Sequence, residues 1–406
     1  MMARLAFTTL LAALCFAGFL AFPLNLAVTN SSLAAAFAGL AALLLLFPSG
    51  RLGLAAALRR HGAAMAAFAV LLTYLALSHS LAAAGPSPGL TGAWYAAAGL
   101  GLLWLAGVCL ANGVHTRELI TAFLIAGIAT AIVSLGLGLI ERAQSLGGAG
   151  LSAFMVLGAF ATIDQIRRDH RNAAPEARPA PAKLALPAAC YLLTFGAIAA
   201  GQMWPAALAG LVGSALAGAS LLLRTPAARR QNATKGLAIL LAIPCVILVI
   251  ALSLAWLGAS THIATAAVPA QTMQALRAAW ADQPFLGAGL GELAAEIGIA
   301  DANTGALYLA EAGWIGVCLA LVPLILLLVA LATAKERRRS PPTGFALALG
   351  LTGAIAVLAP FTQDLTSLSH AGAFLALLGI AAAMADPVRR SALRAEPQER
   401  ANTQRL

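Results

Sequence analysis

The sequence predicts an all-α, polytopic integral membrane protein with about twelve transmembrane helices and one larger outward-facing loop that carries short helices. Three observations support this fold class. Hydrophobic residues make up 61% of the 406 residues and charged residues only 10%, whereas a soluble domain has roughly one quarter charged residues. The mean hydropathy is +0.88. Apolar runs of about 20 residues, the length that crosses a ~30 Å hydrocarbon core, recur along the chain and are too long for barrel strands.

The apolar runs define the predicted spans. In chain order they are 5–22, 32–47, 62–84, 93–111, 119–139, 147–163, 184–200, 204–223, 237–257, 304–332, 345–358 and 368–384. The first run is longer than the apolar core of a usual signal peptide, and no small-residue cleavage site follows it closely. We therefore expect it to be a retained span.

The basic residues predict the orientation, because Lys and Arg are commoner in cytoplasmic connections. The connections alternate between basic and non-basic, and only Arg142 and Arg277 of the 25 Lys and Arg residues fall in the non-basic set. Both termini are then cytoplasmic and the connection 259–303 faces outward. The net charge of +10 is explained by this orientation, so we expect no nucleic-acid partner.

The chain reads as a single helical transmembrane domain over 1–390, followed by a polar cytoplasmic tail over 391–406. Three prolines within 165–183 predict a cytoplasmic linker loop there. The five cysteines all lie in apolar runs without a CxxC pair. No spacing of metal ligands is present, so the sequence predicts no metal site and no cofactor.

The longest polar interruption between apolar runs is the outward connection and its re-entry into the membrane. Met273, Leu276 and Trp280 recur at helical spacing, which predicts an amphipathic helix over 269–282 that rests on the membrane surface. Pro284 ends this helix. A second short helix is predicted over 292–297.

Three alternating glycines follow Pro284, at Gly287, Gly289 and Gly291. Such a run either makes a tight turn or brings backbone N–H groups close to a phosphate. The pattern alone does not choose between the two.

Polar residues mark the start of the following span. Thr304, Tyr308 and Glu311 are spaced to share one helical face. An ionisable group inside an apolar run is costly and usually faces a partner or a water-filled cavity. Glu311 is therefore either functional or held in a structural ion pair or a neutral state. Asp364, between the last two runs, either lines the same cavity or caps a helix.

Two segments of this region carry a resemblance to a known family. The first is PFLGAG at 284–289, and the second runs through Asn303, Leu307 and LAEAG at 309–313 to Gly316. They resemble the bacterial O-antigen ligase and polysaccharide polymerase family of multispanning membrane proteins. Ala302 stands where that family commonly has a histidine. Because family members that polymerise repeat units are diverse, we favour a polymerase-like protein in the bacterial cytoplasmic (inner) membrane, with the loop in the periplasm.

The resemblance implies glycosyl transfer from a polyprenyl-diphosphate-linked glycan, with the bilayer and other polysaccharide assembly proteins as further partners. Such a reaction needs a cation or N–H dipoles at the diphosphate and a base at the acceptor hydroxyl. We assign catalytic roles to Arg277 at the diphosphate and Glu311 as base, together with Asn303. The expected substrate-binding residues are Gly287, Gly289, Gly291, Thr304, Tyr308 and Asp364.

Two other function classes stay open. The first is a transporter or flippase of lipid-linked or small solutes, which usually shows repeats with broken helices at matching positions; the sequence shows no internal repeat. The second is a non-catalytic membrane subunit of a polysaccharide assembly complex.

Overall fold

The computed structural model describes residues 48–82, 116–138, 148–172, 181–201, 203–223, 270–289, 293, 304–333, 343–359, 374, 377–382 and 384. Every regular element in this part of the chain is a helix, which confirms the predicted helical class for these residues. The helices are α3 (Pro48–Ala82), α5 (Thr116–Gly138), α6 (Gly148–Asn172), α7 (Pro181–Ala200), α8 (Trp204–Leu223), α10 (Ala270–Asp282), α12 (Thr304–Thr333) and α13 (Thr343–Leu358).

Four of these helices are long and apolar enough to cross a membrane. The stretches are Glu118–Gly136, Lys183–Ala200, Trp204–Leu223 and Leu307–Ala332. Two shorter apolar stretches are His61–Leu71 and Thr343–Leu358. The predicted spans 5–22, 32–47, 93–111 and 237–257, and the tail 391–406, lie outside the described residues, and the span 368–384 is described only in part.

The linker boundaries predicted on the basic side are wrong. Helix α6 continues to Asn172 and α7 begins at Pro181, so the linker predicted for 165–183 reduces to 173–180, outside the described residues. Pro181 suits a first helical position, where its missing N–H costs nothing. The helix that contains the predicted span 62–84 is longer than that span. It begins at Pro48 and bends at His61, whose φ and ψ are −111° and 18°. Leu52, Leu54 and Ala55 to Ala57 lie before the bend and are good helix formers.

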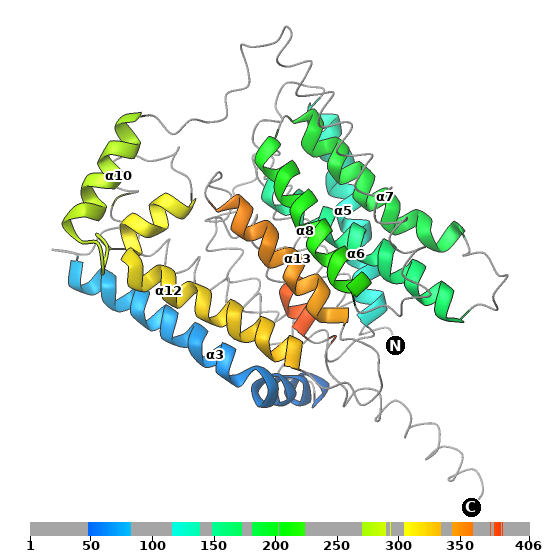
Figure 1. The fold of residues 1–406 in the computed structure, drawn as a ribbon, viewed down its shortest axis with the longest axis horizontal. Coiled ribbons are helices and arrows are strands. Elements are labelled where there is room, and N and C mark those ends of the chain that lie inside the picture. Colours follow the sequence, from blue (N-terminus) through cyan, green and yellow to red (C-terminus); the bar gives the residue numbers. More distant parts are fainter. Residues whose placement is uncertain are drawn as a thin grey trace, which may run out of the picture.

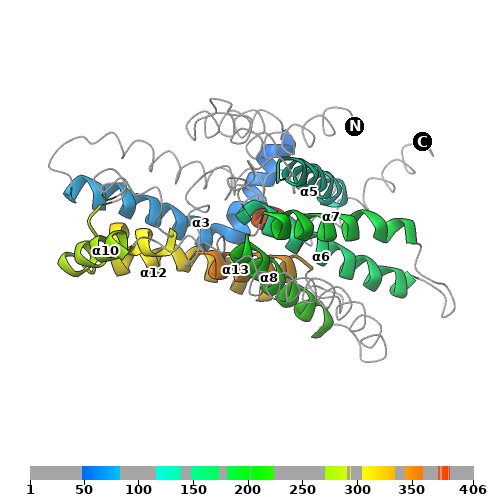
Figure 2. The same cartoon turned by 90° about the horizontal axis from the view of Figure 1, so that it is seen from above.

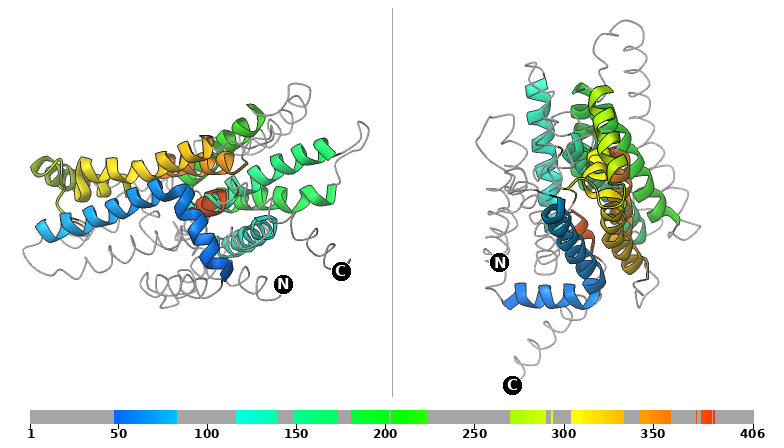
Figure 3. Two further views of the ribbon diagram at one scale, coloured as in Figure 1. Left: turned by 90° about the horizontal axis from the view of Figure 1, so that it is seen from below. Right: turned by 90° about the vertical axis from the view of Figure 1, so that its left-hand side faces the viewer.

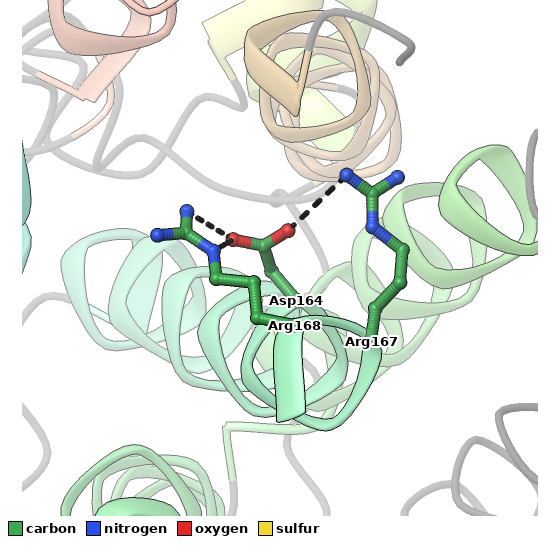
Figure 4. Close-up of polar contacts among 3 residues, drawn as sticks. All are labelled: Asp164, Arg167 and Arg168. Atoms are coloured by element: carbon green, nitrogen blue, oxygen red, sulfur yellow. Dashed lines mark hydrogen bonds and ion pairs between the residues drawn. The ribbon is translucent and has the colours of Figure 1, made fainter. Parts of the chain in front are cut away.

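The extension of α6 is explained by an ion-pair cluster on its own surface (Figure 4). Asp164 is only 4% exposed. The Nε group of Arg168 donates a hydrogen bond of 2.7 Å to Oδ2 of Asp164, and Nη2 of Arg167 lies 3.6 Å from Oδ1. Pairs at these spacings stabilise a helix, and cations near its carboxyl end also favour the helix dipole.

The helices form two groups joined by α13 (Figures 1 and 2). Helices α5, α6, α7 and α8 pack together, with Phe123, Phe154, Phe160, Tyr191 and Phe195 fully buried between them. Helix α13 lies along α8 and α6 and also contacts α12. Helix α12 runs beside α3, and α10 lies across its amino-terminal end (Figures 1 and 3).

Small residues let α8 and α13 approach closely, as the many glycines in the spans suggest. A Cβ atom on Gly213 would lie 2.6 Å from the carbonyl oxygen of Gly350, and a Cβ on Gly350 would lie 2.6 Å from that of Gly213. Both distances are too short for real atoms. Packing of backbone on backbone is typical of membrane helices, in which association depends on van der Waals contact.

Candidate functional site

Helix α10 packs on the first part of α12. Leu276 is 2% exposed and forms a small apolar cluster with Leu293 and Ala310, against which Trp280 and Leu307 also pack. The predicted helix over 269–282 is confirmed to within one residue. The expectation that its apolar stripe rests on the membrane surface is wrong at Leu276, because this side chain is covered by protein. Of the second predicted short helix, 292–297, only Leu293 is described.

Helix α12 is broken at Gly313, whose φ is 62° and ψ is −173°. In a continuous helix each N–H group bonds to the carbonyl four residues earlier. A break therefore removes partners on both sides of it. Unsatisfied backbone groups cost several kcal/mol each in an apolar environment, so other parts of the chain must supply those partners.

The loop after α10 supplies them. On one side of the break, the N–H groups of Ala288 and Gly289 donate to the carbonyl oxygens of Ala310 (3.0 Å) and Glu311 (2.9 Å). On the other side, the N–H of Trp314 donates to Pro284 O at 3.0 Å, and that of Ile315 donates to Phe285 O at 3.2 Å. The loop 284–289 thus takes the place of the missing helical bonds.

The glycines are required for this close approach. Gly287 and Gly313 have φ of 75° and 62°, which other residues rarely adopt. A Cβ atom on Gly287 would collide with the carbonyl of Glu311, and one on Gly313 with the carbonyl of Phe285. The two segments therefore meet backbone to backbone.

This geometry favours the tight-turn interpretation for two glycines of the run. The N–H of Gly287 donates to Gln283 O at 2.8 Å and that of Gly289 to Glu311 O. Both groups are bonded within the protein and serve the turn and the helix break, and a substrate contact at these glycines stays a prediction. Gly291 lies outside the described residues.

Two tyrosines complete the hydrogen bonding at the break. The hydroxyl of Tyr74, on α3, lies 2.9 Å from Ala312 O and 3.2 Å from Leu286 O, and its single proton is shared between these two carbonyls. The hydroxyl of Tyr308 donates to Gly316 O at 3.2 Å. Tyr74 was missed by the sequence analysis. The one signal for it is that a tyrosine inside an apolar helix usually finds a hydrogen-bond partner.

Glu311 lies two residues before the break and is 4% exposed. Among the described residues, Glu311 and Asp164 are the two buried acids. Tyr308 precedes Glu311 by three residues in the same helical segment, so the two share a face as predicted. A buried carboxylate has little contact with water, which strengthens its interaction with any charge or dipole that reaches it.

Arg277 is exposed on α10, beside the buried Leu276. No ion pair or hydrogen bond joins it to another described residue, Glu311 included. The structure therefore does not bring the predicted cation and the predicted base into contact. A substrate between them would have to reach both.

The remaining predicted residues are less fully placed. Thr304 is the first residue of α12. Asn303 and Asp364 lie outside the described part of the chain. Within that part, no group of three or more His, Cys, Asp and Glu side chains is arranged to hold a metal ion.

Replacing Gly313 by Ala is expected to destabilise the protein. The new Cβ atom must displace the backbone of Phe285, and the alanine must keep the positive φ of Gly313. Each of these two effects costs on the order of 1–3 kcal/mol. Thermal unfolding of the purified protein in detergent measures the loss. Gly136→Ala, on α5, is the matched control because nothing lies within 4 Å of its added methyl group. Equal unfolding temperatures for the two variants would contradict the described break.

Comparison with protein-family models, with curated proteins and with solved structures found no match to this chain.

Proposed function

We propose that this chain is a polytopic protein of the bacterial cytoplasmic membrane that transfers glycosyl groups in cell-surface polysaccharide assembly, polymerase-like or ligase-like. The supporting observation is that the two segments which carry the family resemblance, 284–289 and 309–316, form one backbone-paired unit around a broken helix. The buried Glu311 belongs to this unit.

The proposed donor is a polyprenyl-diphosphate-linked glycan. The oxygen of an acceptor hydroxyl attacks the anomeric carbon, the bond from that carbon to the diphosphate oxygen breaks, and polyprenyl diphosphate leaves. Glu311 takes the hydroxyl proton as general base, a role that fits a carboxylate held rigidly by its backbone. Arg277 binds the departing diphosphate through paired hydrogen bonds. Asn303 contacts the same substrate.

Reconstitution tests this proposal directly. The full-length protein is placed in liposomes with lipid-linked glycan repeat units, and the release of polyprenyl diphosphate and the length of the glycan are measured. We expect release and chain extension together. Transport of the intact lipid-linked glycan across the bilayer without release would contradict the enzyme proposal.

The transporter or flippase class is kept as a second candidate because of the break in α12. Discontinuous helices next to a buried ionisable residue are common at transport sites. One observation weighs against this class. The carbonyls of Ala310, Glu311 and Ala312 at the break already accept hydrogen bonds from the loop and Tyr74, so they are less available to a transported ion. The same liposomes distinguish the two classes, as they report translocation and bond cleavage separately.

The proposed topology has about twelve spans, with both termini cytoplasmic and the loop 259–303 periplasmic. We expect single cysteines at Ser260 and Asn303, in a background without native cysteines, to react with a membrane-impermeant thiol reagent added to intact spheroplasts. A cysteine at Ala177 should react only after the membrane is opened. Labelling of Ala177 alone in intact spheroplasts would reverse the orientation.

A further inference from the structure

Four large apolar side chains are exposed where the loop meets the broken helix. The exposed fractions are 66% for Phe285, 48% for Leu286, 48% for Trp314 and 39% for Ile315. The hydrogen bonds from Trp314 N to Pro284 O and from Ile315 N to Phe285 O hold the two pairs side by side. We call these four residues the apolar patch. Contiguous exposed apolar groups of this size mark an interaction surface.

The apolar patch continues along α12. Exposed side chains follow Trp314 at Cys318, Leu321, Ile325 and Val329, at steps of three or four residues. Such steps place them on one face of the helix. The same helix contains the apolar stretch Leu307–Ala332, which is long enough to cross a membrane. The apolar patch is therefore one end of a continuous stripe of exposed apolar side chains on α12.

Part of the loop backbone is bonded within the protein. An unbonded backbone polar group is costly in an apolar environment, so such bonding lowers the cost of bringing the loop close to lipid chains. The carbonyls of Pro284, Phe285 and Leu286 all accept hydrogen bonds, and Pro284 has no N–H group. The N–H groups of Gly287, Ala288 and Gly289 all donate. These bonds leave fewer backbone groups of the loop in need of water.

Polar side chains border the apolar patch on the α10 side. Asp282 and Gln283 are exposed and directly precede Pro284, and Gln274 and Arg277 are exposed farther back along α10. A change from polar to apolar side chains over the few residues from Asp282 to Phe285 is typical of the boundary between lipid headgroups and acyl chains. Trp314 lies at this level, where tryptophan is enriched in membrane proteins.

We infer that the apolar patch is inserted among the lipid acyl chains of the membrane leaflet nearest α10, with Asp282 and Gln283 at headgroup level. The occupant is bilayer lipid, because the patch is continuous with the stripe that α12 presents outward. The inference depends on the proposed span through α12 and extends it to the loop. It is independent of the proposed glycosyl transfer.

Depth-dependent quenching tests the inference. Phe285→Cys is made in full-length protein without native cysteines, labelled with an environment-sensitive fluorophore and reconstituted in phosphatidylcholine and phosphatidylglycerol vesicles. These vesicles carry nitroxide lipids labelled near the headgroup or deep in the chain. We expect strong quenching by the shallow nitroxide, weaker quenching by the deep one, and little quenching by iodide equilibrated across the membrane. Leu286→Cys is the second variant, in case Phe285→Cys fails to fold.

Two reference positions calibrate the quenching, one exposed to water and one inside the bilayer. Gln274→Cys, on the exposed side of α10, should be quenched by iodide alone, and Ile325→Cys, inside the stripe, by the deep nitroxide. Iodide quenching at positions 285 and 286 with nitroxide quenching at 325 would overturn the inference and leave the span intact. Protection from both quenchers would mean that protein covers the apolar patch, which also overturns it. Iodide quenching at position 325 would overturn the span and the inference together.

Discussion

Cells that carry Arg277→Ala as their only copy are expected to make almost no long glycan. In the proposed mechanism Arg277 binds the diphosphate of the donor. It is the only Lys or Arg in the loop 259–303, so no other cation of that loop can replace it. Loss of a charged hydrogen bond to a desolvated partner costs about 2–5 kcal/mol, or roughly 30-fold to several thousand-fold in rate or affinity. Glycan length on a gel, with the protein level checked by blot, measures the effect.

The structure indicates that Arg277→Ala changes binding without changing the fold. Arg277 is exposed and has no partner among the described residues, so its removal should leave the fold unchanged. Arg277→Lys, which keeps the charge but loses the two-point fit to a diphosphate, should give intermediate lengths. Gln274→Ala, exposed on the same helix, is the control and should behave as the wild type. A wild-type length distribution in Arg277→Ala would refute the assignment.

Glu311→Gln is expected to abolish chain extension. Gln keeps the size and hydrogen-bonding capacity of the side chain but cannot accept the acceptor's proton as a carboxylate does. Loss of a general base lowers the rate by about 10²- to 10⁴-fold. The readout is polymer made from lipid-linked donor in liposomes, compared at equal amounts of reconstituted protein.

The burial of Glu311 requires a separate check on folding, because a change at a buried charge alters stability as well as chemistry. The unfolding temperature of Glu311→Gln is therefore measured beside that of Glu118→Gln, an exposed acid at the start of α5. A folded Glu311→Gln protein that still makes full-length polymer would show that the carboxylate has only a structural role.

Much of the helical framework could be predicted from the sequence. Apolar runs identified α5, α7, α8, α12 and α13 to within a few residues, because their length and composition leave no other structure with a fully bonded backbone. The amphipathic pattern identified α10. The error at α6 arose where charged residues continue the helix beyond its apolar run, because hydropathy does not detect a helix made of charged residues.

The helix break was not predictable in the same way. Gly313 lies inside a predicted span, and the local sequence does not show that the helix breaks there and continues through Gly316. Its conformation depends on a loop more than twenty residues earlier and on Tyr74, far away in the chain. The sequence analysis identified the glycine run, but a phosphate and a backbone carbonyl both require glycines whose N–H groups can approach the acceptor closely. Only the tertiary structure separates them.

The pairing at Gly313 also bears on how the chain is made. The partners of the break that lie outside α12, namely the loop 284–289 and Tyr74, both precede α12 in the chain. When α12 leaves the ribosome, these segments have already been synthesised. The backbone groups freed by the break can therefore find these partners as soon as α12 forms, before any later part of the protein is made.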